Sequence, residues 1–386
     1  MPELPEVEVV RRALERLVVG RRVLESVLVR ADVLQPAKGM RRGGGRSEPG
    51  SANPVRGHPE GIEETGHTVP GSQGVDSQAM GSRAIGSWAD AASRVASDHG
   101  CVFLAGRVIE AVRRHGKRLA VVGDDGSAVG VHLGMTGRVE VSDAGDGAEA
   151  NRPAHTHAWW RLEGGAEMRF VDPRRFGGLW DWPPPPPPPE VTPEVHPPPA
   201  RALGSHPAPG TGSGQADRCH SALWFRGLGP DALGASGAEL AQRLRGGRAT
   251  LKAALLDQSR VAGLGNIYAD EALFEARLSP LMRCDRLTWA QAGRLAAAVQ
   301  TTLRAAVAAG GSTLRDYAGP SGERGGYQGR HRVYGRAGEA CVVCGATLLG
   351  FVWAGRATVC CPDCQSTSRV RVARSIGRSR KRQRSR

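Results

Sequence analysis

The stretch CVVCGATLLGFVWAGRATVCCPDC, residues 341–364, contains two cysteine pairs, Cys341 with Cys344 and Cys361 with Cys364. Each pair spans a two-residue gap, and 16 residues separate the pairs. This spacing is typical of a tetrahedral four-thiolate zinc site, in which two tight turns aim the sulfurs inward and a β-hairpin lies between them. Because all four ligands come from the protein, no position is open for a substrate. The sequence therefore predicts one structural Zn²⁺ ion, with four unrelated buried cysteines as the alternative.

Two other residues of this hairpin bear on its function. Arg356 lies between the cysteine pairs, and a guanidinium presented by a hairpin is well suited to bind phosphate. Cys360 directly precedes the second pair and leaves open whether it competes as a ligand. Four of the eight cysteines fall into the metal-type array, which favours an intracellular protein over a disulfide-linked secreted one.

The region before the hairpin has a helical pattern. Thr288 and Gln291 have the spacing of a capping box. An apolar face at helical spacing continues through Leu295, Val299, Leu303 and Val307. We therefore predict a helical domain over residues 221–330, followed by a zinc finger over residues 331–365.

Residues 1–182 begin with one helical pattern and continue with strand patterns. Glu6 to Val19 is amphipathic, with Val9, Val10, Ala13, Leu14 and Leu17 on one side. Alternating β-branched runs follow at Val23–Val29, Gly106–Val122, Ala128–Val141, Ala158–Leu162 and Glu167–Val171. The sequence predicts an α+β fold, in which an N-terminal helix and an antiparallel β-sandwich precede the helical domain and the zinc hairpin.

Three segments are predicted to be disordered. Residues 37–100 are rich in Gly, Ser, Pro and Arg, and residues 183–220 begin with seven consecutive prolines. Neither can bury enough apolar surface to offset chain entropy, so both are expected to be insertions. The tail, residues 366–386, holds nine basic and no acidic residues, so that of the net charge of +14 the rest of the chain carries only +5. Such an excess favours a polyanionic partner, most commonly nucleic acid.

No apolar run approaches the length of about 20 residues that a membrane span needs. The first residues, MPELPE, lack the basic and then apolar build of a secretory signal. We expect a cytoplasmic protein without a membrane partner. Binding of nucleic acid, which the net charge favours, would associate it with the nucleoid.

Several segments together resemble the formamidopyrimidine-DNA glycosylase family. They are PELPE at residues 2–6, HLGMTG at 132–137, DPRRFG at 172–177, GLGNIYADE at 263–271 and the zinc hairpin. Their order is that of the family. The resemblance implies a helix–two-turns–helix motif in the helical domain. It also implies a bacterial, monomeric enzyme that acts on double-stranded DNA in base-excision repair, removes 8-oxoguanine and formamidopyrimidines, and cleaves the abasic strand by β,δ-elimination.

The same resemblance assigns four catalytic residues. Pro2, exposed as a secondary amine once Met1 is removed, matches the Schiff-base nucleophile, and Glu3 matches the proton donor. Lys117 matches the lysine of β-elimination, although most basic turns are solvated faces. Arg356 matches the phosphate-binding arginine linked to δ-elimination. Glu6 is either a partner of this site or a carboxylate that counters the dipole of the first helix.

Further positions are expected to contact DNA. Met135, Arg174 and Phe176 match the wedge residues that fill the gap left by an everted nucleotide, and sandwich core is the alternative for Met135 and Phe176. Asn266 suits a phosphate oxygen at a helix start or, alternatively, an N-cap. His155 and Arg248 match additional DNA-contact positions. The segment 311–317 with the loop to Gly329 resembles the one that folds over the extruded base.

Three other functions remain open at this point. An endonuclease VIII-like glycosylase would act on oxidised pyrimidines, but Leu4 and the full wedge set favour purines. A non-catalytic damaged-DNA-binding protein would need neither Pro2, Glu3 nor Lys117. A zinc-ribbon adaptor would leave the N-terminal motif without a role.

Overall fold

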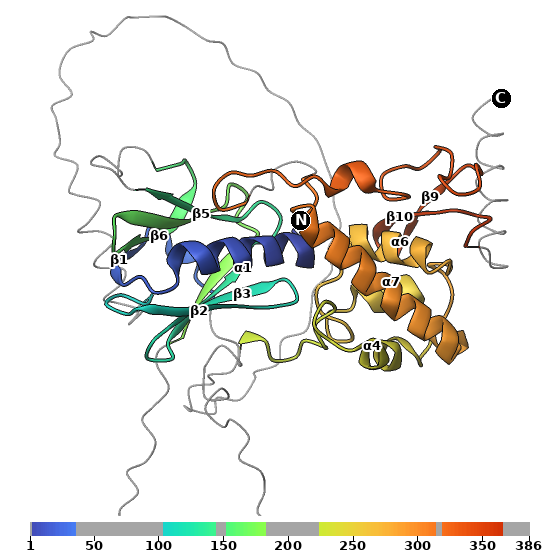
Figure 1. The fold of residues 1–386 in the computed structure, drawn as a ribbon, viewed down its shortest axis with the longest axis horizontal. Helices are drawn as coiled ribbons and strands as arrows, with labels where there is room; N and C mark the ends of the chain where they lie inside the picture. Colours follow the sequence, from blue (N-terminus) through green and yellow to red (C-terminus); the bar gives the residue numbers. More distant parts are fainter. Residues whose placement is uncertain (1, 36–102, 144–151, 183–223, 314–318, 366–386) are drawn as a thin grey trace, which may run out of the picture.

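The computed structural model describes residues 2–35, 103–143, 152–182, 224–313 and 319–365. The predicted insertions at 37–100 and 183–220, and the basic tail, lie outside the described residues. The described chain forms two lobes that lie side by side (Figure 1). The first contains helix α1 and the sheets, and the second contains the remaining helices and the zinc hairpin.

Helix α1 (Leu4–Val18) begins at a reciprocal capping box. The Glu3 side chain accepts from the helix backbone and the Glu6 side chain accepts from the backbone of Glu3. Val7, Val10, Leu14 and Val18 recur at helical spacing and are buried in the core of the first lobe. The helix contacts β2 and also α7, so its N-terminal end reaches the second lobe (Figure 1).

Two four-stranded antiparallel sheets are formed by the described residues of the first lobe. One has the order β1 (Val23–Leu28), β6 (Thr156–Leu162), β7 (Ala166–Val171) and β5 (Arg138–Asp143). The other has the order β2 (Ile109–His115), β3 (Arg118–Gly123), β4 (Ala128–His132) and β8 (Gly178–Trp182). Their inner faces share one core, to which Leu119 and Val129 contribute from the second sheet and Trp160 and Phe170 from the first. The predicted antiparallel sandwich is confirmed.

The structure divides two segments that the sequence pattern joined. Residues 106–122 form the hairpin of β2 and β3, and residues 128–141 form β4 and β5, which belong to different sheets. The break falls at Leu133–Gly137, where the Gly137 N–H donates to the Leu133 carbonyl at 2.8 Å. Gly134 adopts a φ of +58°, which an alternating apolar pattern does not reveal. Strand β8 was not predicted.

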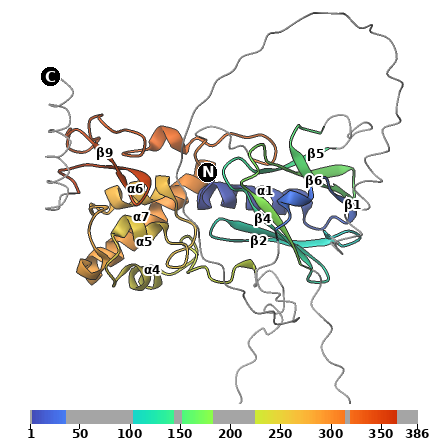
Figure 2. The same ribbon diagram turned by 180° about the vertical axis from the view of Figure 1, so that it is seen from behind.

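The second lobe contains α4 (Gly237–Leu244), α5 (Leu251–Leu256), α6 (Asn266–Glu275) and α7 (Trp289–Ala308), which are visible from behind in Figure 2. Short 3-10 turns of this lobe are η3 (Cys284–Arg286) and η4 (Tyr327–Arg330), and another, η1 (Ala31–Val33), follows β1 in the first lobe. The predicted capping box of Thr288 and Gln291 starts α7. Helix α6 is buried on nearly every side, which makes it the centre of this lobe. No helix of the described segments is both long and apolar enough to cross a membrane.

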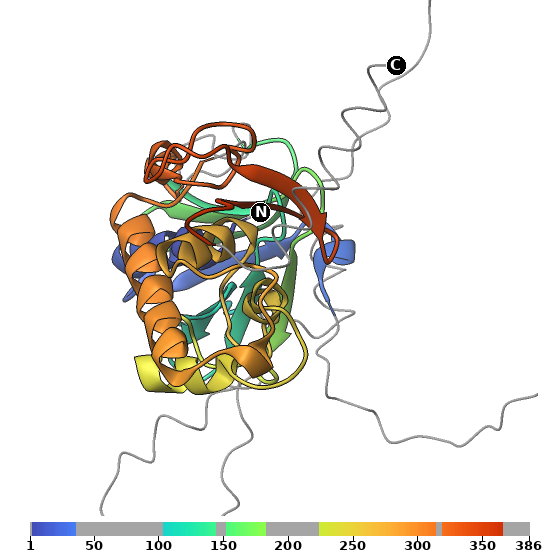
Figure 3. The same cartoon turned by 90° about the vertical axis from the view of Figure 1, so that its right-hand side faces the viewer.

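The zinc hairpin consists of β9 (Leu349–Trp353) and β10 (Arg356–Cys360), and β10 packs against α6 (Figure 3). A fully buried ion pair fixes this contact. Lys252 donates to Asp270 at 2.7 Å and to the Ala357 carbonyl at 2.8 Å, and Asp270 accepts the Val359 N–H at 3.1 Å. The hairpin is thereby held against α6, and the N-terminus of the chain reaches the first turn of the same helix.

Candidate active site

The carboxylate of Glu3 lies at the N-terminal end of α6. It accepts the N–H groups of Gly265 at 2.7 Å, Ile267 at 2.9 Å and Tyr268 at 3.4 Å. These groups have no partner within the helix, so Glu3, from the other lobe, caps α6. Glu3 is only 3% exposed, and the adjacent Pro2 is also buried. The expected nucleophile and proton donor therefore lie together where the two lobes meet.

Two glycines of the loop before α6 make this approach possible. A Cβ on Gly263 would lie 2.3 Å from the Leu4 side chain, and one on Gly265 would lie 2.3 Å from Glu3 Cδ. The Leu4 N–H also donates to the Gly263 carbonyl at 3.0 Å. The glycines of this loop are thus needed to receive the N-terminus.

Glu6 takes part in the capping box of α1 and also contacts the second lobe. Its position at the helix start is confirmed, and a role in the site stays a prediction. One oxygen accepts the Glu3 N–H at 2.7 Å, and the other accepts Tyr268 OH at 2.5 Å and the Ser312 N–H at 2.7 Å. Burial and the neighbouring Glu3 raise the pKa of Glu6. A second carboxyl group that can carry a proton therefore lies one helical turn from the N-terminus.

Lys117 lies in the turn between β2 and β3 and is 9% exposed, so it is not part of a solvated face. Burial lowers the pKa of its ammonium group, Arg356 lowers it further, and Glu3 and Glu6 oppose the shift. These influences show that Lys117, Glu3, Glu6 and Arg356 are electrostatic neighbours. The structure thus gathers the residues predicted from the first helix, the sheet and the zinc hairpin.

A buried ion-pair network fixes the Lys117 turn to the second lobe. Arg114 donates to Asp231 at 2.5 and 3.0 Å and to Glu8 at 2.7 Å. The Gly116 N–H also donates to Asp231 at 2.7 Å. Because Asp231 precedes α4 and Glu8 lies on α1, the network joins three segments that are distant in sequence.

The predicted wedge residues lie outside this cluster, on two adjoining loops. Met135 is 43% and Phe176 is 54% exposed, so neither is sandwich core. Arg174 is exposed, and its guanidinium carbon lies 4.8 Å from the centre of the Phe176 ring. Buried Asp172 joins the loops by accepting from Thr136 Oγ1 at 2.6 Å and the Gly177 N–H at 2.7 Å. Exposed apolar groups on a rigid support are suited to insertion into a base stack.

The other predicted DNA-contact residues occupy separate positions. Asn266 is the first residue of α6, Gly265 is the N-cap, and Asn266 Nδ2 donates to the Ala357 carbonyl at 2.9 Å. The N-cap alternative for Asn266 is therefore wrong, because Gly265 occupies the N-cap position and the Glu3 carboxylate accepts the N–H groups of the first turn. Exposed His155 has a φ of +67°, and its carbonyl accepts the Asp172 N–H at 3.1 Å. Arg248 is exposed in the turn before α5, and Arg356 is exposed at the start of β10.

The four predicted zinc ligands form one cluster, with all four sulfurs within 4.8 Å of one another. Cys341 and Cys364 Sγ are 4.0 Å apart, and Cys344 and Cys361 Sγ are 3.4 Å apart. A tetrahedral zinc–thiolate site with Zn–S bonds of about 2.3 Å requires sulfurs about 3.8 Å apart, so the cluster fits this ion. Cys360 is excluded from the cluster and is buried against Leu281.

Sequence reasoning did not single out Tyr268, Ser312, Arg114 or Asp231 as parts of the site. Tyr268 and Ser312 fall within segments that were recognised, but no spacing rule links them to Glu6. Arg114 and Asp231 are 117 residues apart. A buried charge pair of this separation has no local signature, because its partners meet only after the lobes have packed.

Family models agree with this architecture. The model of the formamidopyrimidine-DNA glycosylase N-terminal domain matches residues 1–43 and 78–179, and the model of the H2TH domain of the same glycosylase matches residues 227–318. The formamidopyrimidine-DNA glycosylase of Thermosynechococcus vestitus is 39% identical over 267 residues, which cover 69% of this chain and 82% of that protein. The one of Acidiphilium cryptum is 34% identical over 372 residues, which cover 95% and 100%.

Solved structures show the same fold. The MutM (Fpg) protein from Thermus thermophilus matches with a TM-score of 0.62 and 30% identity, covering 95% of this chain and all of that one. Lactococcus lactis Fpg in complex with DNA containing an abasic site matches with a TM-score of 0.62 and the same coverage, but with 23% identity it supports the fold alone.

The fold, the cysteine cluster and these matches together define a DNA glycosylase of base-excision repair. The chain belongs to the formamidopyrimidine-DNA glycosylase family, whose members are bifunctional glycosylases and abasic-site lyases.

Proposed function

We propose that this enzyme removes oxidised purines, namely 8-oxoguanine and formamidopyrimidines, from double-stranded DNA and cleaves the abasic strand by β,δ-elimination through a Schiff base at Pro2. The observation that carries the proposal is the anchoring of the N-terminus. Glu3 is held by the start of α6 and Leu4 by the Gly263 carbonyl, so the chain is anchored directly after residue 2, and the charge of Glu3 acts on the ammonium group of Lys117. A fixed nucleophile lowers the entropic part of the barrier.

The first chemical step uses the secondary amine of processed Pro2. Its nitrogen attacks C1′ of the everted nucleotide, and the glycosidic bond breaks as the base leaves with the bonding electrons. Glu3 supplies a proton to the sugar ring oxygen as the ring opens, and the nitrogen lone pair completes an iminium ion. The buried position of Glu3 beside Pro2 supports this division of roles.

The strand is then cleaved by two eliminations. The iminium acidifies C2′, loss of a C2′ proton expels the 3′ phosphate, and a second elimination expels the 5′ phosphate. Lys117 is suited to proton transfer because burial lowers the pKa of its ammonium group toward neutrality. Exposed Arg356 is placed to bind the leaving phosphate.

Zn²⁺ bound by the four cysteines would have a structural role, because its ligand set leaves no open position. The cysteines hold the turns on either side of β9 and β10, and thereby keep Arg356 beside α6. The chain's own residues perform every chemical step of base release and strand cleavage.

Binding of the duplex is assigned to residues of both lobes, of which Arg248, His155 and Arg356 are exposed and Asn266 is partly buried. Asn266, Arg248, His155 and Arg356 are proposed to contact phosphates, while the wedge residues fill the space of the everted base. Related Lactococcus lactis proteins are in complex with DNA that contains Fapy-dG or an abasic site, which supports DNA as the partner here. We propose in addition that the enzyme acts as a monomer.

The test is borohydride trapping on duplexes that contain either 8-oxoguanine or thymine glycol. We expect a covalent adduct with the 8-oxoguanine duplex, mapped by mass spectrometry to residue 2 of the processed chain. Glu3→Gln should reduce base release by about 100-fold or more, because general acid catalysis contributes this much. Glu110→Gln, at an exposed position of β2, is the matched control and should behave like the wild type.

Two outcomes would contradict the proposal. Preferential cleavage of thymine glycol would favour the endonuclease VIII-like alternative. Tight binding of lesion DNA without an adduct, in protein shown to lack Met1, would favour a non-catalytic damage-binding protein.

A further inference from the structure

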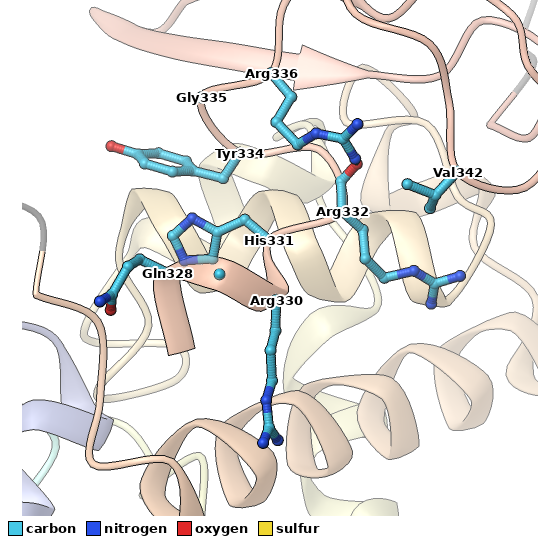
Figure 4. A pocket seen from close by; sticks show the side chains of 9 residues that line it. Gln328, Arg330, His331, Arg332, Tyr334, Gly335, Arg336 and Val342 are labelled. Carbon is cyan, nitrogen blue, oxygen red and sulfur yellow. The ribbon is translucent and has the colours of Figure 1, made fainter. Parts of the chain in front are cut away.

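A cavity of about 490 Å³ lies on the second lobe, between η4 and the first turn of the zinc finger. Its lining includes Gln328, Arg330, His331, Tyr334, Arg336 and Val342. Figure 4 shows the His331 imidazole in the middle of this lining, between the Gln328 and Tyr334 side chains. None of these residues takes part in the chemical steps proposed for base release and strand cleavage.

A continuous series of hydrogen bonds leads from this cavity to the active site. His331 Nε2 lies 3.1 Å from Ser312 Oγ, and Ser312 Oγ lies 3.1 Å from Tyr268 OH. Tyr268 OH donates to Glu6 Oε1 at 2.5 Å. Glu6, Tyr268 and Ser312 are at most 5% exposed, whereas His331 is half-buried at the cavity.

The inner end of the series lies close to the nucleophile. Glu6 Oε2 accepts the Glu3 N–H at 2.7 Å, and the Pro2 nitrogen is three covalent bonds from the Glu3 nitrogen. Standard backbone dimensions therefore place the Pro2 nitrogen within about 6.5 Å of that carboxylate oxygen. The proton lost by Pro2 therefore has at most about 6.5 Å to cross to reach Glu6.

We propose that Tyr268, Ser312 and His331 form a proton path that carries the proton lost by the Pro2 ammonium group from Glu6 to solvent at the cavity. The proposal rests on the nucleophilic role of Pro2 proposed above. Glu6 takes the proton, and each hydroxyl group receives one proton and passes on its own. His331 Nε2 accepts the proton from Ser312 Oγ, and Nδ1 on the other side of the ring releases one to water. No electrons are transferred and no other reactant is needed.

The surroundings of both ends suit this transfer. Burial lowers the pKa of His331, which Glu271 on α6 opposes, so the ring is neutral at pH 7 and able to accept. The rings of Tyr327 and Tyr334 contact the imidazole, and Arg330 and Arg332 adjoin it in sequence.

At the inner end, the groups that face Glu6 include Glu3, Tyr268 and Ser312, with Lys117 nearby on the turn between β2 and β3. Burial and Glu3 raise the pKa of Glu6, which makes this carboxylate a better proton acceptor than an ordinary glutamate. Burial and Glu6 raise the pKa of Tyr268, which keeps its hydroxyl group protonated and able to relay.

The experiment measures single-turnover formation of the borohydride-trapped adduct from pH 5.5 to 8. We expect His331→Ala to slow adduct formation about tenfold, because a positioned proton acceptor is lost. Added imidazole should enter the enlarged cavity and restore at least half of the rate at pH 7.5. Rescue should fade at lower pH, because only neutral imidazole accepts a proton.

Two further variants separate a proton path from a structural role. Ser312→Ala should slow the reaction to a similar degree and should not respond to imidazole, because the break lies deeper in the path. Val342→Ala, which also lines the cavity but has no bond to the path, should match the wild type with and without imidazole. Circular dichroism checks that every variant is folded.

Three results would overturn the proposal. Wild-type rates in His331→Ala, slow rates without rescue, or rescue that is independent of pH would each exclude a proton path through His331. Absence of an adduct with the wild-type enzyme would instead refute the role of Pro2, so the two failures are distinguishable.

Discussion

The carboxylate of Glu3 accepts the backbone N–H of Gly265 at 2.7 Å, although the two residues are 262 positions apart. This contact lets the first helix position the N-terminus and also completes the cap of α6. The site is therefore a product of the packing of the two lobes. Substitutions that disturb this packing should affect catalysis even where they touch no substrate.

Gly265→Ala tests this dependence directly. Its Cβ would lie 2.3 Å from Glu3 Cδ, so the carboxyl group that caps α6 beside Pro2 must move. Because a misplacement of about 1 Å can cost about 100-fold in rate, we expect a loss of that order in lesion cleavage. Single-turnover cleavage of an 8-oxoguanine duplex measures it.

Gly293→Ala is the matched control, because a Cβ there has no neighbour within 4 Å on helix α7. It should keep full activity and stabilise the helix by up to about 1 kcal/mol. Equal activity of the two alanine variants would show that the approach of Glu3 to Gly265 is unimportant.

Stability at acid pH should depend on Glu8. Burial by itself would raise the pKa of this carboxyl, but hydrogen bonds from Arg11, Arg114 and Arg12 outweigh it and lower the pKa to about 2. The pKa in the folded state lies below the ordinary value of 4.5, so the stabilisation is complete above pH 4.5 and is lost as the pH falls toward 2. Thermal unfolding between pH 6 and 2.5 should show this loss.

The variant Glu8→Gln removes the titrating group. Its melting temperature should lie below that of the wild type near neutral pH, and the difference should shrink as the pH falls. Glu15→Ala, which breaks an exposed pair with Arg11, should cost no more than about 0.5 kcal/mol. A difference between Glu8→Gln and wild type that stays constant with pH would contradict the assignment.

The zinc content of two cysteine variants should show which cysteines bind the ion and that Cys360 does not. Cys344→Ala removes one of four thiolates, so we expect loss of the ion and of DNA affinity as the hairpin loses its support. Cys360→Ala should retain one zinc ion per chain, because Cys360 lies outside the cluster. Elemental analysis of the purified proteins measures the zinc content. Loss of zinc from Cys360→Ala but not from Cys344→Ala would show that Cys360, and not Cys344, is a ligand.

The wedge residues should matter for excision but not for stability. Phe176 is 54% exposed, so Phe176→Ala should change the free energy of unfolding by no more than about 0.5 kcal/mol while it slows 8-oxoguanine release from duplex DNA. Phe170→Ala, at a fully buried position of β7, should lower the free energy of unfolding by about 3–5 kcal/mol. Strong destabilisation by Phe176→Ala would show that this residue is part of the sandwich core.

Much of the fold could be predicted because its signals are local. The cysteine spacing, the capping box at Thr288 and the alternation of the strands each depend on neighbouring residues, and the structure contains the corresponding elements. The division of residues 128–141 between two sheets was missed, because the turn depends on glycine backbone geometry at Gly134 and not on hydrophobic pattern.

By itself, the sequence determined which chemical groups this enzyme has: an N-terminal motif with two carboxylates, a basic turn, a four-cysteine array and a glycine-rich loop. Only the tertiary structure decided that Glu3 caps α6, that Lys117 is buried, and that Glu6 connects through Tyr268 and Ser312 to His331. The physical reason is that burial, shifted pKa values and hydrogen bonds across hundreds of residues arise only when the two lobes pack and exclude water.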